Sequence, residues 1–373
     1  MGVTEARVRA VLGARDGGPV GSWPGAAPGP ASLNAGFVKW FGTEPAGLWH
    51  APGRLALMGE QTAAIGGPAL FAALPWGVTA AVGPTEDGRT RTATPHGPLS
   101  ERHRAAREVE SVAASARACG LLSDGQGLRV VFGADLPAHS SLGYAAALGA
   151  AVTLALADLA GADLPEDLPV ARRVCLTARS GQVVRVNQGS GRAALFPFDL
   201  TAADLRLVVM DTGALPRRDP RPTRAAELTR AEELLGPLRS IQDLPATLRG
   251  IQHPVLRERV EFAATEIHRL NATVGLLRTD RCGEVGPVLS ASHLSLRGFD
   301  LPLRTVEAAV EAAARSGARG ARMTGWAGTA FALVPSDRVE DVAAGVREAF
   351  RGRGRPEPRV RVAVPAEGAR RVD

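Results

Sequence analysis

The chain is poor in lysine, tyrosine and cysteine. Lys39 is its one lysine and Tyr144 its one tyrosine among 373 residues, and aromatic residues make up only 4% of the total. Its three cysteines, Cys119, Cys175 and Cys282, are far apart and show no CxxC spacing. The sequence therefore predicts neither a disulfide framework nor a zinc site, and no other metal site is indicated. This cysteine usage fits a reducing, cytoplasmic location.

Long apolar runs are also missing. One uncharged stretch, residues 140–157, is rich in alanine and is interrupted by Gly143 and Gly149. This pattern favours a buried helix over a membrane span. The first thirty residues lack a basic segment followed by an apolar one, so we expect no secretory signal. The sequence thus predicts no membrane partner.

The net charge is +6, and arginine carries almost all of the positive charge. The arginines are scattered among acids, and the densest run, at 351–361, has no aromatic side chains that could stack on bases. We therefore expect a solvated surface and no nucleic-acid partner. Hydrophobic residues (45%) and charged residues (22%) are at ordinary globular levels. The length favours two domains.

Local patterns indicate how the chain is organised. Residues 1–32 hold an amphipathic segment around 8–12 and a Gly/Pro/Ala-rich stretch at 17–30, which predicts an arm and linker before a folded body that starts near Phe37. Between 52 and 82, short apolar runs broken by Gly and Pro predict strands joined by tight loops. Helical periods occur at 101–120, 142–159, 224–236, 256–278 and 303–316, and β-like runs occur at 128–133, 193–197, 206–211, 329–334 and 358–364.

This mixture lacks regular βαβ repetition and predicts an α+β fold. A stretch rich in proline and arginine, residues 216–222, is the candidate join between two domains. The predicted domains are therefore 33–215 and 216–373.

Four blocks carry a family resemblance. Residues 51–67 read APGRLALMGEQTAAIGG and resemble the galactokinase signature APGRVNLIGEHTDYNGG. Residues 135–147, DLPAHSSLGYAAA, stand where that family has its phosphate loop, DVPLGAGLSSSAS. Residues 208–212, VVMDT, are similar to a later family strand, though weakly. The last block has TE at 265–266, SHLSLR at 292–297 and GARMTG at 320–325, similar to TENxRV, SHxSLR and GARMTGGGFGG.

The resemblance is to the galactokinase branch of the GHMP small-molecule kinases and covers roughly residues 37–373. It implies a two-domain α+β fold with a ribosomal-protein-like N-terminal domain and a ferredoxin-like C-terminal domain. It also implies an active site in which ATP, Mg²⁺ and a small-molecule sugar meet. ATP and Mg²⁺ are therefore the cofactors expected if the chain is active.

Two positions bear on catalysis. Arg54 matches the family's active-site arginine, and a guanidinium fork suits the γ-phosphate; the alternative is a structural arginine in a strand. Asn187 falls where the resemblance implies the catalytic aspartate. An amide cannot take a proton, and the loss of a general base removes about 10²- to 10⁴-fold of rate. The alternative is that the alignment slips after Gln188. Asp211 and Glu266 are acids within matched blocks, but nothing favours either as a replacement.

The implied ATP-binding positions are Ser140, Ser141, Gly143 and Tyr144. Small residues let backbone N–H groups approach phosphate, and Ser140 or Ser141 is expected to cap the helix that follows. Tyr144 is bulky where the family motif is small, so we expect it to fill part of the nucleotide space.

The implied sugar-binding positions are Glu60, Gln61 and Ala63, which replace the family's Glu-His-Asp set. A site built to bind hydroxyls loses discrimination when such partners are apolar. Trp326 interrupts the last glycine block and either packs in the core, which we favour, or narrows the cleft.

These substitutions predict a protein of galactokinase descent in which phosphoryl transfer is weak or lost. Two alternatives stay open. One is an active, diverged sugar kinase that converts ATP and galactose, or a related sugar, to the sugar 1-phosphate. The other is a pseudoenzyme that senses a ligand or binds a protein partner.

Overall fold

A computed structural model describes residues 23–100 and 102–373. Contacts divide this part of the chain into two compact units. The first contains residues 55–72 and 181–365, and the second contains 23–54, 73–180 and 366–373. Strands β1 (Gly47–Met58) and β2 (Pro68–Thr85) each contribute residues to both units. The predicted sequential domains, 33–215 and 216–373, stay a prediction.

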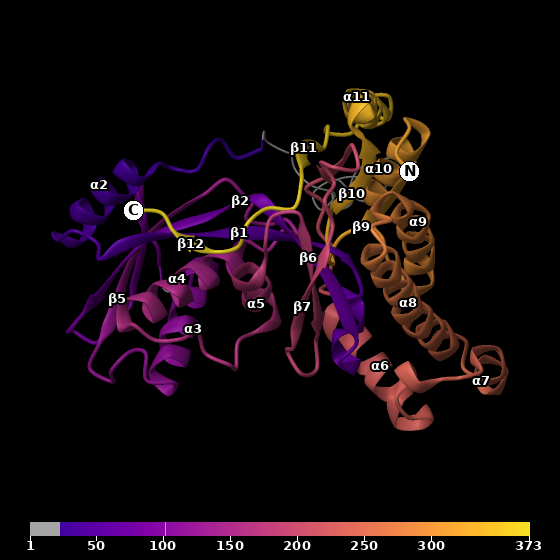
Figure 1. Ribbon diagram of the computed structural model, residues 1–373, viewed down its shortest axis with the longest axis horizontal. Helices are drawn as coiled ribbons and strands as arrows, with labels where there is room; N and C mark the ends of the chain where they lie inside the picture. The colour runs from indigo at the N-terminus through magenta and orange to yellow at the C-terminus, as the bar shows by residue number, and fades with distance from the viewer. Residues whose placement is uncertain (1–22, 101) are drawn as a thin grey trace, which may run out of the picture. The chain divides into compact units, whose positions relative to one another are not determined.

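The larger sheet has eight strands in the order β12-β1-β2-β5-β3-β4, with β6 also paired to β2 and β7 to β6. The remaining strands of this sheet are β3 (Arg91–Thr94), β4 (Gly97–Pro98), β5 (Gly127–Ala134), β6 (Gln182–Asn187), β7 (Ala193–Pro197) and β12 (Arg370–Arg371). In the second unit α3 (Arg104–Ala118) packs on α4 (Tyr144–Ala160), which also contacts α5 (Val170–Thr177) (Figure 1).

The second unit begins earlier than the sequence predicts. Helix α2 (Pro30–Phe41) starts within the predicted arm, with a proline in its first turn. Leu33 and Phe37 from this helix are almost fully buried, and Trp23 already packs on Trp76 with a ring separation of 4.8 Å. The prediction that the body starts near Phe37 is therefore wrong. The rest of the predicted arm, 1–22, lies outside the described residues.

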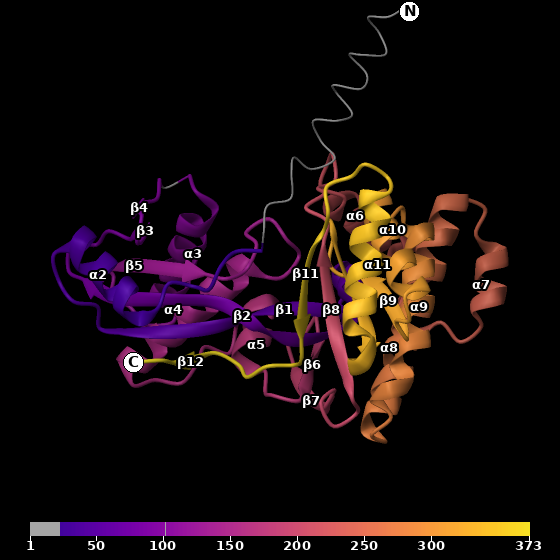
Figure 2. The same cartoon turned by 90° about the horizontal axis from the view of Figure 1, so that it is seen from above.

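The first unit contains a four-stranded antiparallel sheet in the order β11-β8-β10-β9. Its strands are β8 (Leu205–Asp211), β9 (Gly320–Met323), β10 (Thr329–Pro335) and β11 (Arg359–Ala363). Helices α10 (Arg304–Arg315) and α11 (Val339–Arg351) pack on this sheet (Figure 2). Among the described residues, the other α-helices of this unit are α6 (Arg221–Leu235), α7 (Leu244–Gly250), α8 (Pro254–Arg278) and α9 (Val285–Ser295).

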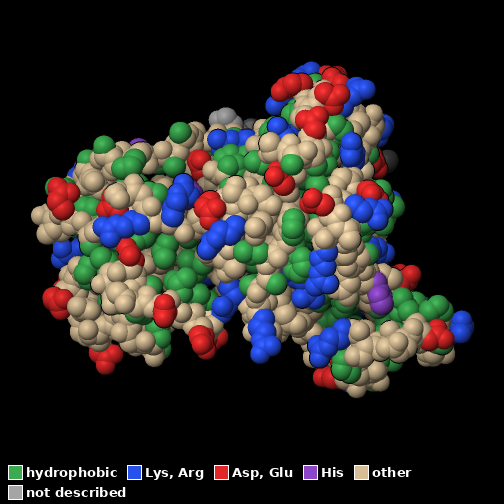
Figure 3. All heavy atoms as spheres, in the orientation of Figure 1, with side chains coloured by type: hydrophobic (Ala, Val, Ile, Leu, Met, Phe, Trp, Pro, Cys, Tyr) green, Lys and Arg blue, Asp and Glu red, His purple; other side chains and the backbone are tan. Residues whose placement is uncertain are grey.

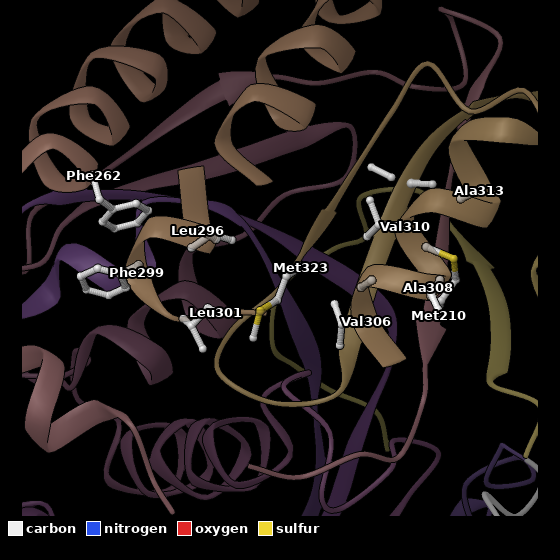
Figure 4. Packing of buried hydrophobic residues seen from close by; sticks show 14 of the residues in the cluster. Met210, Phe262, Leu296, Phe299, Leu301, Val306, Ala308, Val310, Ala313 and Met323 are labelled. Carbon is white, nitrogen blue, oxygen red and sulfur yellow. The ribbon is translucent and has the colours of Figure 1, made fainter. Parts of the chain in front are cut away.

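An apolar core holds these elements together (Figure 4). Met210 and Met323 from the sheet are fully buried, as is Val306 from α10. Phe262 stacks on Phe299 with ring centroids 4.3 Å apart. Burial of such side chains stabilises the fold by about 1.5–3 kcal/mol each.

The α+β class is confirmed, as are the five predicted helices and the five predicted strands. Strands are confirmed between 52 and 82, but loops at Pro52 and Gly77 are wrong, because β1 runs through Pro52 and β2 through Gly77. A Cβ on Gly77 would lie 2.1 Å from the carbonyl oxygen of Ala51. Glycine at this position permits close backbone approach and does not break the strand.

The surface matches the expected mixture of charges. On the face shown in Figure 3, Lys and Arg side chains lie among Asp and Glu side chains. No helix in the described residues has both the length and the apolar character to cross a membrane. Within the same residues, no group of three or more His, Cys, Asp or Glu side chains could hold a metal ion.

Candidate functional site

Arg54 and the beginning of helix α4 meet in the second unit. The backbone N–H of Arg54 donates to the Leu142 carbonyl at 2.9 Å. Gly143 precedes the helix with a φ of 82°, and a Cβ on it would lie 2.8 Å from Cγ of Arg54. The glycine therefore makes room for the arginine stem beside the helix N-terminus. The partial positive charge there and an arginine are both favourable for an anion.

The other predicted ATP-binding residues do not all act as expected. Helix α4 has no side-chain cap, so the prediction that Ser140 or Ser141 caps it is wrong. The hydroxyl of Ser140 instead donates to the Pro137 carbonyl at 2.7 Å, which stabilises the preceding turn. The ring of Tyr144 packs edge-on against Phe132, with centroids 6.2 Å apart. Burial raises the pKa of Tyr144, so its phenol stays neutral.

Glu60 and Arg322 form the centre of a buried ionic network in the first unit. Glu60 opens the short helix η1 (Glu60–Ile65), and Arg322 lies on β9. Nη1 of Arg322 donates to Oε1 of Glu60 at 3.0 Å, and Nη2 donates to Oε1 of Glu266 at 3.0 Å. The Arg322 Nε–H donates to the hydroxyl of Ser292 at 2.8 Å. Burial alone would lower the pKa of Arg322, but Glu60 and Glu266 raise it overall.

The two polar side chains predicted to bind sugar are both used within this network. Oε1 of Glu60 also accepts from the Gly325 N–H at 2.9 Å. The amide of Gln61 accepts from Arg322 at 3.0 Å and donates to Glu60 and to the Gly325 carbonyl, both at 3.0 Å. Glu60 is 7% exposed and Gln61 only 2% exposed. Ala63 is exposed and apolar. The structure thus brings Glu60 and Gln61 together as interior groups.

Asn187 builds a turn. Its side-chain oxygen accepts from the N–H groups of Gly189 and Ser190 at 3.1 and 2.9 Å, and from the Ser190 hydroxyl at 3.1 Å. Asparagine commonly holds turns in this way. The next residue, Gln188, donates to the carbonyls of Gly59 and Gly67, each at 3.0 Å. Asn187 therefore stabilises the hairpin between β6 and β7, and Gln188 connects that hairpin to Gly59 and Gly67 of the first matched block.

The two acids considered as replacements for the implied catalytic aspartate also have partners within the fold. Asp211 is 1% exposed, pairs with Arg359 and accepts from the Gly213 N–H at 3.0 Å. Glu266 is fully buried and accepts from Arg322 and Ser292. Both carboxylates thus have structural partners.

Two further residues of the matched blocks are structural. Nδ1 of His293 accepts from the Met323 N–H at 3.2 Å, and its Nε2 lies 3.5 Å from Glu307. Burial lowers the pKa of His293 to about 4, although Glu307 acts in the opposite direction. Trp326 packs against the apolar core, with its ring 6.3 Å from that of Phe299. The favoured core packing of Trp326 is therefore observed.

Sequence reasoning missed the role of Arg322 and Ser292. Both lie in matched blocks, at GARMTG and SHLSLR. The available signal was an arginine placed between two apolar residues, Ala321 and Met323, since buried arginine is rare unless it is paired.

Comparisons with known proteins agree with these blocks. Residues 35–84 match the galactokinase galactose-binding signature. A galactokinase of Streptomyces coelicolor is 32% identical over 390 residues, covering 90% of this chain and 97% of that protein. A galactokinase of Chloroflexus aurantiacus is 26% identical, covering 86% of this chain and 92% of that protein.

Solved structures show the same fold. Lactococcus lactis galactokinase complexed with galactose matches with a TM-score of 0.80 at 21% identity, covering 92% of this chain and 99% of that one. The mevalonate kinase of L. major matches with a TM-score of 0.58 at 16% identity, covering 94% and 99%. The extent of the Streptomyces match, together with the signature at 35–84, shows that this chain belongs to the galactokinase family of GHMP kinases.

Proposed function

We propose that this chain is a galactokinase-like protein in which phosphoryl transfer is weak or lost. The observation that carries the proposal is that the side chain of Asn187 is used to hold its own turn. Its side-chain oxygen already accepts from three donors in its own turn, and an amide has no basic group to take a proton from a sugar hydroxyl.

The sugar-binding positions support the same conclusion. Both oxygens of Glu60 face Arg322, at 3.0 and 3.3 Å. Release of Glu60 toward a sugar would leave the buried Arg322 and Glu266 with poorer partners, which is costly. Ala63 offers no hydrogen bond. Discrimination between sugars is therefore expected to be poor.

The alternative is an active, diverged sugar kinase that uses ATP and Mg²⁺ on galactose or a related sugar. Arg54 beside the N-terminus of α4 favours this alternative, because the pair suits a phosphate group. A ligand sensor, or a scaffold for a protein partner, would keep the fold without the chemistry. The cytoplasmic location stays a prediction.

A paired experiment separates weak from ordinary catalysis. Mg-ATP binding is measured by calorimetry, and ADP release is measured with a panel of hexoses that includes galactose. Asn187→Asp is the matched variant, since a carboxylate accepts the same turn hydrogen bonds and adds a base. We expect the wild-type rate to lie at least about 10²-fold below an ordinary kinase rate of about 1–100 s⁻¹. Ordinary turnover by the wild type would contradict the proposal.

A further inference from the structure

A second feature of the molecule is a pocket in the second unit that the proposed function does not use. It has a volume of about 360 Å³ and lies between α3, α4 and residues 165–172. Apolar side chains form most of its wall, among them Val112, Ala116, Leu121, Leu156 and Leu168. This size and lining are typical of pockets that bind small molecules.

The hydroxyls in the pocket wall act mainly as acceptors. Ser115 donates its hydrogen to the Ser111 carbonyl at 3.0 Å, and Thr153 donates to the Gly149 carbonyl at 2.7 Å. Each hydroxyl oxygen keeps a lone pair, while its one hydrogen is used. A ligand that donates hydrogen bonds therefore fits these groups better than one that accepts them.

Three charged side chains line the pocket, those of Glu166, Asp167 and Arg172. Arg172 is 4% exposed, and its guanidinium lies 2.9 Å from Glu108, which neutralises it. Glu166 and Asp167 are exposed and have no ion-pair partner among the described residues. The neighbouring Arg173 donates to the main-chain oxygen of Glu166 instead of to its carboxylate. The pocket thus joins an apolar wall to two carboxylates that form no ion pair among the described residues.

We propose that this pocket binds a small primary ammonium compound with an apolar body. The apolar part would contact the Leu121, Leu156 and Leu168 side chains, and the ammonium group would lie at Glu166 and Asp167. An ammonium group has three donors and a positive charge, which suits carboxylates and hydroxyl acceptors together. Thr153 lies about 14 Å along the helix axis from Tyr144 at the start of α4. The pocket therefore lies apart from the phosphate position at Arg54.

Cys119 provides a reporter for occupancy of the pocket. It is exposed and lines the pocket, whereas Cys175 and Cys282 are buried. Burial also raises the pKa of Cys175 to about 12, which keeps its thiol unreactive. Modification of the full chain by a maleimide, located by peptide mass spectrometry, therefore reports access to Cys119.

The test compares three probes of similar shape. These are 2-phenylethylammonium, the neutral 2-phenylethanol and the anionic 3-phenylpropanoate. We expect the ammonium compound to slow modification of Cys119 about tenfold at saturation, with little effect of the other two at the same concentration. Failure of the ammonium compound to protect Cys119, or equal protection by the alcohol, would overturn the proposal.

Substitution of the two pocket carboxylates provides a second test of the proposal. The double change Glu166→Gln and Asp167→Asn should abolish protection by the ammonium compound while leaving the circular dichroism spectrum unchanged. Asp163→Asn is the matched control, because Asp163 is an exposed acid of the same loop that does not line the pocket. Protection that persists in the double variant would contradict a role for the two carboxylates.

Discussion

Arg322 and Glu60 form an ion pair that is almost inaccessible to solvent. The side chain of Arg322 is fully buried, that of Glu60 is 6% exposed, and Nη1 lies 3.0 Å from Oε1. Arg322 also pairs with Glu266 at 3.0 Å, and Glu266 has a second cation, Arg269, at 3.6 Å. The ion pair between Arg322 and Glu60 thus joins the galactokinase motifs GEQ (residues 59–61) and GARMTG (residues 320–325) in the interior of the first unit.

Loss of the guanidinium should destabilise the protein strongly. Arg322→Met would leave Glu60 buried without its cation and Glu266 with only the more distant Arg269, and we expect a loss of about 3–5 kcal/mol in the free energy of unfolding. Urea denaturation measures this loss. Arg338→Met is the control, since its ion pair with Asp341 is exposed and should contribute at most about 1 kcal/mol. Equal effects of the two changes would show that the network contributes little.

The hairpin at Asn187 should depend on its side-chain oxygen. Asn187→Ala removes an acceptor used by the N–H groups of Gly189 and Ser190, and we expect a loss of about 1–2 kcal/mol. Asn187→Asp keeps the acceptor and should unfold at nearly the wild-type urea concentration. If both variants lose the same stability, the turn does not depend on these hydrogen bonds.

A side chain at Gly143 should destabilise the fold more than one at Gly161. Gly143→Ala combines left-handed backbone with a Cβ 2.8 Å from the Arg54 stem. Gly161, at the other end of α4, has a φ of 60° and no atom within 4 Å of such a Cβ. Gly161→Ala therefore carries only the backbone cost of about 1–2 kcal/mol, and Gly143→Ala should cost about 1 kcal/mol more. Thermal unfolding of both variants compares them, and a smaller cost at Gly143 would contradict the close contact.

Acid should destabilise the fold through His293. Its pKa is about 4 in the folded protein, below the ordinary 6.5, so the unfolded chain binds more protons between these values. Its contribution to the free energy of unfolding, about 3 kcal/mol in total, is fully present above pH 6.5 and is lost as the pH falls toward 4. His50 acts in the same direction, with its pKa also lowered to about 4 by burial.

The variant His293→Gln distinguishes the contribution of His293 to the pH dependence of stability from that of His50. Urea denaturation between pH 4 and pH 7 should show a shallower pH dependence for the variant than for the wild type. An unchanged slope would mean that His293 does not titrate between its folded and unfolded pKa values as described.

Periodicity predicted the helices well because burial of one face depends on local spacing. Helix α8 (Pro254–Arg278) was expected at 256–278. Strands were predicted between 52 and 82, but their continuation through Pro52 and Gly77 was missed, because the fit of glycine in a strand depends on the neighbouring strand, here the Ala51 carbonyl beside Gly77.

The candidate site was predictable as a set of positions, and the contacts of those positions were not. The sequence identified Glu60 as a family position, yet its partner Arg322 lies 262 residues further along the chain. The side-chain oxygen of Asn187 accepts hydrogen bonds from Gly189 and Ser190, which an alignment of residue types does not reveal. Direction and burial of a side chain depend on tertiary packing.

ADP release with Mg-ATP and galactose tests the central claim most directly. The wild type should release ADP at least about 10²-fold more slowly than an ordinary sugar kinase. A rate within the ordinary range, measured on wild-type protein whose activity disappears in an Arg54→Ala variant, would contradict the account and establish an active, diverged galactokinase.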